Sequence, residues 1–161
     1  MNKLIIAVTL LVVFGLGVLV WASGTERGSV SLGEELQAGE VVVYKTPDCG
    51  CCDVYAQHLS RSGVNTQAID ISHQEMQAKK DEYGIPQNLL SCHTSMVEGY
   101  FVEGHVPLEV IERLLEERPD IAGIALPGMP SGTPGMPGPK REDWVIQAIG
   151  HDGVVTEFMR I

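Results

Sequence analysis

The sequence predicts an α/β fold: one small domain over residues 41–161 that ends in a β-hairpin. Strand-like and helix-like segments alternate along its first part, which is typical of βαβ units. Two later apolar segments flank Asp152-Gly153, a strong signal for a hairpin turn. The roughly 120 residues of this region are enough for a single core and too few for two ordinary domains.

Residues 1–22 are expected to form a hydrophobic helix that serves as a signal peptide or a membrane anchor. Lys3 gives a short positive region, and no charged residue follows from Leu4 to Trp21. Such a run is long for a signal peptide and about long enough to cross a bilayer. Val20-Trp21-Ala22 is a weak cleavage site, so cleavage and retention both stay open. Because Lys3 precedes the span, the rest of the chain is expected outside the cytoplasm, in an oxidising compartment.

Residues 23–40 are expected to form a flexible linker, because they are rich in Gly, Ser and Glu and poor in large apolar side chains. The formal net charge of the chain is -10. This charge argues against nucleic acid as a partner, since no stripe of Lys and Arg is present to neutralise phosphates. An acidic surface that keeps the domain in solution explains the charge more simply than an attraction for cations does.

The first half of the domain is predicted to alternate strands and helices. The apolar run Val41–Tyr44 indicates a buried strand. Thr46-Pro47-Asp48 then supplies turn and N-cap residues before a helix that extends to about Ser62. A second strand is expected over residues 64–71, and a helix follows from the capping box Ser72-His73-Gln74-Glu75. The apolar face of the first helix is expected to carry Val54, Tyr55 and Leu59.

The second half is predicted to hold one or two strands over residues 96–106, a helix, a loop and the hairpin. Pro107 suits the first position of the helix. Residues 125–139 form a loop with a repeated Pro-Gly-Met-Pro unit, and residues 144–149 and 154–161 form the hairpin strands. This order of elements predicts a thioredoxin-like fold. The apolar stripe of the helix is expected to be Leu108, Ile111, Leu114 and Leu115.

Three of the four cysteines lie within the four residues Cys49-Gly50-Cys51-Cys52. A set of simple structural disulfides is disfavoured, because adjacent cysteines and Cys-x-Cys pairs rarely meet the geometry of the bond. Two interpretations stay open. One is a redox dithiol of Cys49 and Cys52, which have Cys-x-x-Cys spacing. The other, which we favour, is a site where several sulfurs share metal.

The cysteines at the start of the predicted helix are expected to bind a soft cation. The free N–H groups and the dipole of a helix N-terminus stabilise thiolates there. Cu(I) is the leading candidate, because thiolate and thioether ligands select it. Zinc is the weaker alternative, since zinc sites normally take their cysteines from separated pairs rather than from one tight turn.

Other soft or borderline donors are candidate ligands for the same metal site. Cys92 must come close to the first three sulfurs, as a thioredoxin-like topology allows; otherwise it is a small buried core residue. His93 and His105 are candidate ligands or hydrogen-bond donors to ligands, although His105 could instead bond a loop carbonyl. Met129 and Met136 are thioethers on the Pro-Gly-Met-Pro loop, where filling gaps between side chains is at least as good an explanation. The remaining histidines are expected to be solvated: His58, His73 and His151.

Four motifs resemble the CopG family of bacterial copper-resistance proteins, in the right order along residues 41–161. They are Thr46-Pro47-Asp48-Cys49-Gly50-Cys51-Cys52, Ser91-Cys92-His93-Thr94, Val102-Glu103-Gly104-His105-Val106-Pro107 and Leu126-Pro127-Gly128-Met129-Pro130. The resemblance implies a thioredoxin-like fold, a periplasmic location and a cysteine-bridged polynuclear copper cluster. The ligands would be Cys49, Cys51, Cys52 and Cys92. It also implies interconversion of Cu(I) and Cu(II), which would make the chain a copper oxidoreductase.

The expected function is therefore periplasmic copper binding in copper resistance, with copper ions and a copper chaperone or electron-transfer protein as partners. The chain would be secreted, or tethered to the inner membrane through residues 4–21. A rival function is a thiol–disulfide oxidoreductase that uses Cys49 and Cys52. The extra Cys51 and the lack of a Trp before the motif argue against it. A third function is that of a copper chaperone.

Overall fold

A computed structural model describes residues 39–161, which fall within one compact unit of the chain. These residues form a single sheet of seven strands, three α-helices and one short 3-10 helix. The elements are, in chain order, β1 (Glu40–Lys45), α3 (Gly50–Arg61), β2 (Asn65–Asp70), α4 (His73–Glu82), η1 (Gln87–Leu89), β3 (Thr94–Val97), β4 (Tyr100–Glu103), α5 (Leu108–Glu117), β5 (Gly123–Ala125), β6 (Val145–Ile149) and β7 (Val155–Arg160).

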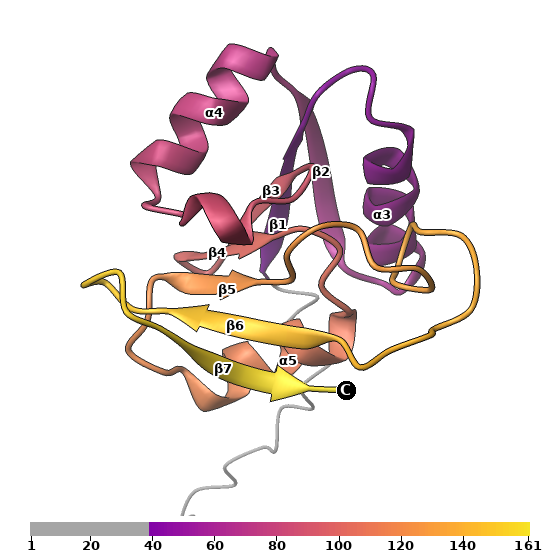
Figure 1. Ribbon diagram of the computed structural model, residues 1–161. Coiled ribbons are helices and arrows are strands. Elements are labelled where there is room, and N and C mark those ends of the chain that lie inside the picture. The colour runs from indigo at the N-terminus through magenta and orange to yellow at the C-terminus, as the bar shows by residue number, and fades with distance from the viewer. Residues whose placement is uncertain (1–38) are drawn as a thin grey trace, which may run out of the picture. The chain divides into compact units, whose positions relative to one another are not determined.

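The strand order across the sheet is β2-β1-β3-β4-β5-β6-β7. The pairs β1/β2 and β4/β5 are parallel, and every other neighbouring pair is antiparallel. The parallel pair β1/β2 is joined through α3, as a βαβ connection requires. The chain ends in the hairpin of β6 and β7, as the Asp152-Gly153 signal predicts (Figure 1).

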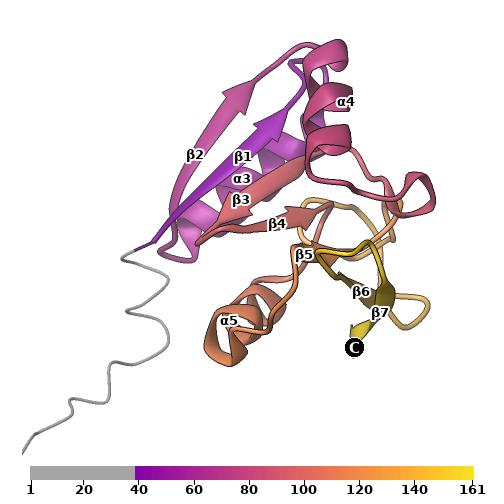
Figure 2. The same cartoon turned by 90° about the vertical axis from the view of Figure 1, so that its left-hand side faces the viewer.

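Helices cover both faces of the sheet. In Figures 1 and 2, α3 and α4 lie on opposite sides of β1, β2 and β3. Two apolar clusters match this arrangement, because neighbouring residues of one strand point to opposite faces. In β4, for example, Val102 belongs to the larger cluster with α3 and α5, and Phe101 to the smaller one beside η1. The prediction of an α/β domain is therefore confirmed.

Most predicted elements form, with a few corrections. Helix α4 opens on the predicted capping box, in which Ser72 and Glu75 bond each other's backbone N–H groups. Val54 was expected on the buried face of α3 and is 51% exposed. The N-cap of α3 is Cys49 and not Asp48, because the turn predicted at Thr46 closes on the amide of Cys49. Pro107 is likewise the N-cap of α5 rather than its first residue.

The N-terminal predictions lie outside the described residues: the signal peptide or anchor at 1–22, and the linker at 23–40 apart from its last two positions. Within residues 39–161, no helix has the length and apolar character needed to cross a bilayer.

Candidate metal centre

The register of the sheet brings four chain segments to one place. Tyr44 of β1 pairs with Thr94 of β3, which pairs with Glu103 of β4, which in turn pairs with Ala125 of β5. The segment after β1, the segment before β3 and the segments after β4 and β5 therefore meet at one end of the sheet. These segments carry the cysteines, His93, His105 and the Pro-Gly-Met-Pro loop.

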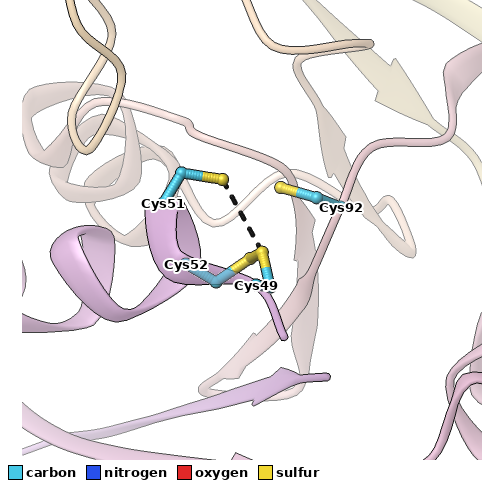
Figure 3. Close-up of side chains that lie close together, drawn as sticks. All are labelled: Cys49, Cys51, Cys52 and Cys92. Atoms are coloured by element: carbon cyan, nitrogen blue, oxygen red, sulfur yellow. Dashed lines mark hydrogen bonds between the residues drawn. A yellow bond between two sulfur atoms is a disulfide. The ribbon is translucent and has the colours of Figure 1, made fainter. Parts of the chain in front are cut away.

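All four cysteine sulfurs converge at this end of the sheet. Cys49, Cys51 and Cys52 lie at the start of α3, and Cys92 approaches from the segment before β3 (Figure 3). The four sulfurs lie within 4.8 Å of one another. The expected approach of Cys92 to the other three is therefore confirmed, while the role of each residue as a metal ligand stays a prediction.

The four sulfurs are in two chemical states. Cys49 and Cys52 form a disulfide, and Cys51 and Cys92 are free. The free Cys51 sulfur lies 3.6 Å from that of Cys49, and Figure 3 shows it pointing towards Cys92. The bonded pair is the one predicted for a redox dithiol, so the cluster can take up or release two electrons without metal.

Two buried histidines surround the Cys92 sulfur. Its distance to Nε2 of His105 is 3.1 Å, and its distance to Nδ1 of His93 is 3.4 Å. Nδ1 of His105 donates to the carbonyl oxygen of Pro134 at 2.6 Å. Because a carbonyl can only accept, the proton of neutral His105 is on Nδ1, and the lone pair of Nε2 faces the sulfur. His105 thus makes the bond to a loop carbonyl that was expected as the alternative, and it also lies against the Cys92 sulfur.

Burial keeps these side chains neutral. It lowers the pKa of His93 well below its usual 6.5, and the neighbouring His105 and Lys80 lower it further. Burial also lowers the pKa of His105, against the opposing effect of the Pro134 carbonyl. The pKa of the Cys92 thiol rises to about 12, first because of burial and then because of the nearby Cys51. The site therefore offers neutral imidazoles, and a cation that binds Cys92 must displace a proton.

The ring of Tyr55 packs against the rings of both histidines. Its ring centroid lies 4.5 Å from that of His93 and 5.5 Å from that of His105. Its hydroxyl donates to the carbonyl of Val106 at 2.9 Å. The sequence predicted Tyr55 only as part of an apolar helix face, because periodicity cannot tell which residues of another segment a side chain will contact.

A buried ion pair, which the sequence did not indicate, fixes the chain next to Cys92. Lys80 of α4 and Glu103 of β4 pair with side chains that are 5% and 0% exposed. Glu103 also accepts from the amide of Ser91 at 2.6 Å and from the hydroxyl of Thr94 at 2.6 Å, while Lys80 donates to the carbonyl of Ser91 at 3.0 Å. Both backbone groups of Ser91 are thereby held by charged partners. A lysine eight residues into a polar helix gives no sign of such a contact.

The Pro-Gly-Met-Pro loop packs against the site through Gly135. A Cβ atom on Gly135 would lie 2.7 Å from the carbonyl oxygen of Cys51 and 3.1 Å from Nδ1 of His105. The loop therefore approaches the start of α3 as closely as a backbone can. Met129, however, is 53% exposed and Met136 is partly buried. Their predicted role as ligands stays untested.

Comparison with solved structures decides the family. Form 2 of "Copper resistance protein copG" is 34% identical to this chain, with a TM-score of 0.69, and the match covers 76% of this chain and 98% of that one. Form 1 is 35% identical, with a TM-score of 0.66 and coverage of 76% and 96%. The chain belongs to the CopG family. Residues 89–136 also match a family described as "Protein of unknown function, DUF411". Among the curated proteins, no match was found.

The donor set of this CopG-family chain suits a soft metal. Four sulfurs within 4.8 Å of one another, with no carboxylate among them, are ligands that select Cu(I) over hard cations. Three of the four, Cys49, Cys51 and Cys92, are partly exposed and only Cys52 is buried, so the cluster is accessible to solvent.

Proposed function

We propose that this CopG-family chain binds copper in copper resistance, through the four cysteines at the start of α3 and before β3. The convergence of four sulfurs within 4.8 Å carries the proposal. The two solved relatives are named copper resistance proteins, and the match to this chain covers nearly the whole length of each. Thiolates in such a group repel one another, and Cu(I) ions that bridge them would neutralise their negative charge.

The finer form of the proposal is a polynuclear cluster in which Cys49, Cys51, Cys52 and Cys92 bridge several copper ions. Reduction of the Cys49–Cys52 disulfide is a precondition, because two of the four sulfurs are otherwise bonded to each other. Interconversion of Cu(I) and Cu(II) is supported by the Cys49–Cys52 pair, because joining two thiolates in this disulfide releases two electrons, enough to reduce two Cu(II) ions to Cu(I). The strand order β2-β1-β3-β4, with α5 directly after β4, supports the thioredoxin-like assignment of the scaffold.

Metal analysis tests this proposal directly. We expect the reduced full chain to retain several copper ions when loaded anaerobically with Cu(I), with sulfur-only neighbours in X-ray absorption. Cys51→Ser and Cys92→Ser should each remove most of this copper. Ala78→Ser, which adds a serine at an exposed position of α4, should leave it unchanged. A single zinc ion per chain, independent of copper supply, would contradict the proposal.

A second candidate function is thiol–disulfide exchange by Cys49 and Cys52. The disulfide between these residues, next to a helix N-terminus, favours it. Insulin reduction by the metal-free chain would support this function if it persists in Cys51→Ser and disappears in Cys52→Ser. Loss of the activity on complete removal of metal would argue for copper chemistry instead.

We also propose that the chain works in the periplasm, exported through residues 4–21, which are either cleaved or kept as an inner-membrane tether. The hydrophobic run and the preceding Lys3 support export. There, the partly exposed Cys51 and Cys92 would allow exchange of copper or electrons with a chaperone or electron-transfer protein. Fractionation of cells, with N-terminal sequencing of the recovered chain, would distinguish cleavage from retention, and recovery in the cytoplasm would refute export.

A further inference from the structure

One buried carboxylate holds the residues on both sides of the Cys92-His93 dipeptide. One oxygen of Glu103 accepts from the backbone N–H of Ser91 at 2.6 Å. The other oxygen accepts from the hydroxyl of Thr94 at 2.6 Å. Ser91 directly precedes Cys92, and Thr94 directly follows His93. The fully buried Glu103, at the end of β4, therefore brackets the short segment that carries the Cys92 sulfur.

Lys80 binds the same segment from α4. Its ammonium group pairs with the Glu103 oxygen that Ser91 also contacts, and it donates to the carbonyl oxygen of Ser91 at 3.0 Å. Ser91 thus bonds to an anion through its N–H and to a cation through its C=O. Hydrogen bonds to charged groups are stronger than those between neutral groups. Because these partners belong to a helix and a strand, the position of Ser91 is set by the regular elements of the domain.

The side chain of Ser91 contacts the two other segments of the site. Its hydroxyl donates to the carbonyl oxygen of Gly128 in the Pro-Gly-Met-Pro loop. A Cβ atom on Gly104, next to His105, would lie 2.7 Å from the Cβ of Ser91. Only a glycine at position 104 allows this approach. A shift of Ser91 would therefore change the place of Cys92 relative to both segments.

The stability of the fold is not a sufficient reason for the Lys80–Glu103 pair. Burying two charges costs solvation free energy, and replacing a buried ion pair by apolar side chains of similar volume is often neutral or stabilising. The two side chains are 5% and 0% exposed, so they lose nearly all of their hydration. An apolar pair would lack directed bonds to the backbone. Such bonds matter at Cys92, which lies outside any helix or strand, between η1 and β3.

We propose that Lys80 and Glu103 are positioning residues for the copper centre. By fixing Ser91 and Thr94, they keep the Cys92 sulfur beside the three sulfurs at the start of α3. The two residues act through the backbone and are not ligands. The inference rests on the proposed function, because the property that they control is the affinity for Cu(I). Loss of both side chains should lower this affinity about tenfold, the smaller effect of removing outer partners of metal ligands.

Two variants of the full chain separate positioning from stability. Lys80→Met/Glu103→Leu removes both charges and every bond to Ser91, but leaves no charge unpaired. Glu103→Gln keeps the shape of the side chain and an oxygen that accepts from the Ser91 amide, but leaves Lys80 unpaired. We expect the double variant to lose less unfolding free energy than Glu103→Gln and yet to lose more affinity for Cu(I). Denaturant unfolding of the metal-free chain and competition with a chromogenic Cu(I) chelator measure the two quantities.

A second readout needs no metal. In Cys51→Ser with the disulfide intact, Cys92 is the one free thiol of the chain. Adding Lys80→Met/Glu103→Leu should speed hydrogen exchange at the Ser91 amide about tenfold or more, as expected when a bond to a charged group is lost. The reaction of Cys92 with a thiol reagent should also become faster, because its backbone is no longer held.

The matched control is Arg113→Met/Glu117→Leu, which removes an exposed ion pair on α5 in the same way. It should change neither the two rates nor the affinity for Cu(I). Its role is to show that the effects of the buried pair come from the contacts at Ser91 and not from the loss of charge.

Two results would overturn the inference. One is an unaltered Cu(I) affinity in Lys80→Met/Glu103→Leu, and the other is an affinity that falls only as the unfolding free energy falls across the variants. If the unaltered reduced chain takes up no Cu(I), the proposed function fails instead. The exchange rate of the Ser91 amide and the reaction rate of Cys92 then decide by themselves whether the pair positions Cys92, and unchanged rates would refute it.

Discussion

At the scale of single side chains, the buried Lys80 and Glu103 are expected to have a large effect on stability. Removing one partner of a buried ion pair leaves an uncompensated charge and costs about 3–5 kcal/mol. We expect Glu103→Gln to lower the free energy of unfolding by about this amount, because Lys80 is 5% exposed and has no other anion in its described contacts. Denaturant unfolding of the metal-free chain would measure it.

The matched control is Glu117→Gln. Glu117 pairs with Arg113 at 2.7 Å on the surface of α5, where both side chains are 44% exposed. Exposed pairs of this spacing contribute only about 0.3–0.5 kcal/mol. Equal effects of the two substitutions would mean that burial of the Lys80–Glu103 pair has no special role in holding Ser91.

His93 should make the metal-free fold sensitive to acid. Its pKa in the folded chain lies well below 6.5, while the unfolded chain takes up the proton near that value. The unfolded state therefore binds more protons below about pH 6.5, and the free energy of unfolding falls there by about 1.4 kcal/mol per pH unit for this one group. Above that pH the contribution of neutral His93 is fully present.

Thermal unfolding between pH 5 and 7 in the presence of a chelator tests this prediction. His93→Gln should flatten the slope by about one proton, while His105, whose pKa is also lowered, supplies the part that remains. The control is Ala78→Ser, at an exposed position of α4 without a titratable side chain, and it should leave the slope unchanged. An unaltered slope in His93→Gln would show that His93 is already protonated in the fold.

At the scale of elements, the loop between β5 and β6 holds two copies of the Pro-Gly-Met-Pro unit, so equivalent substitutions in the two copies can be compared. Gly128 and Gly135 occupy the same position in the two Pro-Gly-Met-Pro units, and both have positive φ, 70° and 85°. An added Cβ meets nothing within 4 Å at Gly128, but lies 2.7 Å from the Cys51 carbonyl at Gly135. Gly128→Ala should therefore cost only the roughly 1–2 kcal/mol of the left-handed conformation.

Gly135→Ala should cost about 1–3 kcal/mol more, because the backbone of the loop must also move away from α3. We expect this variant to increase the reaction rate of Cys51 with a thiol reagent, since its covering loop is displaced. Chemical unfolding and thiol kinetics of the two variants provide the comparison. Equal rates would mean that the loop does not cover the cysteines.

Elements with strong local signals were predicted well. The capping box gave the start of α4, and the Asp152-Gly153 turn gave the hairpin. The short strand β5 (Gly123–Ala125) was missed, because three residues are too few for a period-2 pattern. Its pairing with β4 is what extends the sheet to the hairpin, and that pairing depends on a contact between distant segments.

At the scale of the whole molecule, the sequence predicted which residues lie close together, but not which cysteines are bonded or which other side chains contact them. The Cys-x-Cys-Cys motif and the Cys92-His93 pair identified the candidate centre, since such residue types are rarely crowded for packing alone. The spacing offered Cys49 and Cys52 as a redox pair only as one of two interpretations, and it was the structure that showed them bonded. The position of Tyr55 and the ion pair at Ser91 followed only from the fold. Each depends on distances between segments that the order of residues leaves open.

The fold as a whole should not depend on the disulfide or on metal. The Cys49–Cys52 bond closes a loop of only a few residues, which limits its stabilisation to about 2 kcal/mol. The core, by contrast, consists of side chains from α3, α5 and five or more strands. We expect the chain with reductant and chelator to unfold in one cooperative thermal transition, at a somewhat lower temperature than the chain with its disulfide. Loss of that transition would mean that the cysteines hold the domain together.

Adding Cu(I) to the reduced chain should then raise its stability by about 2.7 kcal/mol for each independently bound ion at a free concentration of 100 times the dissociation constant. The same addition to the oxidised chain should have a smaller effect, because two of the four sulfurs are already bonded to each other.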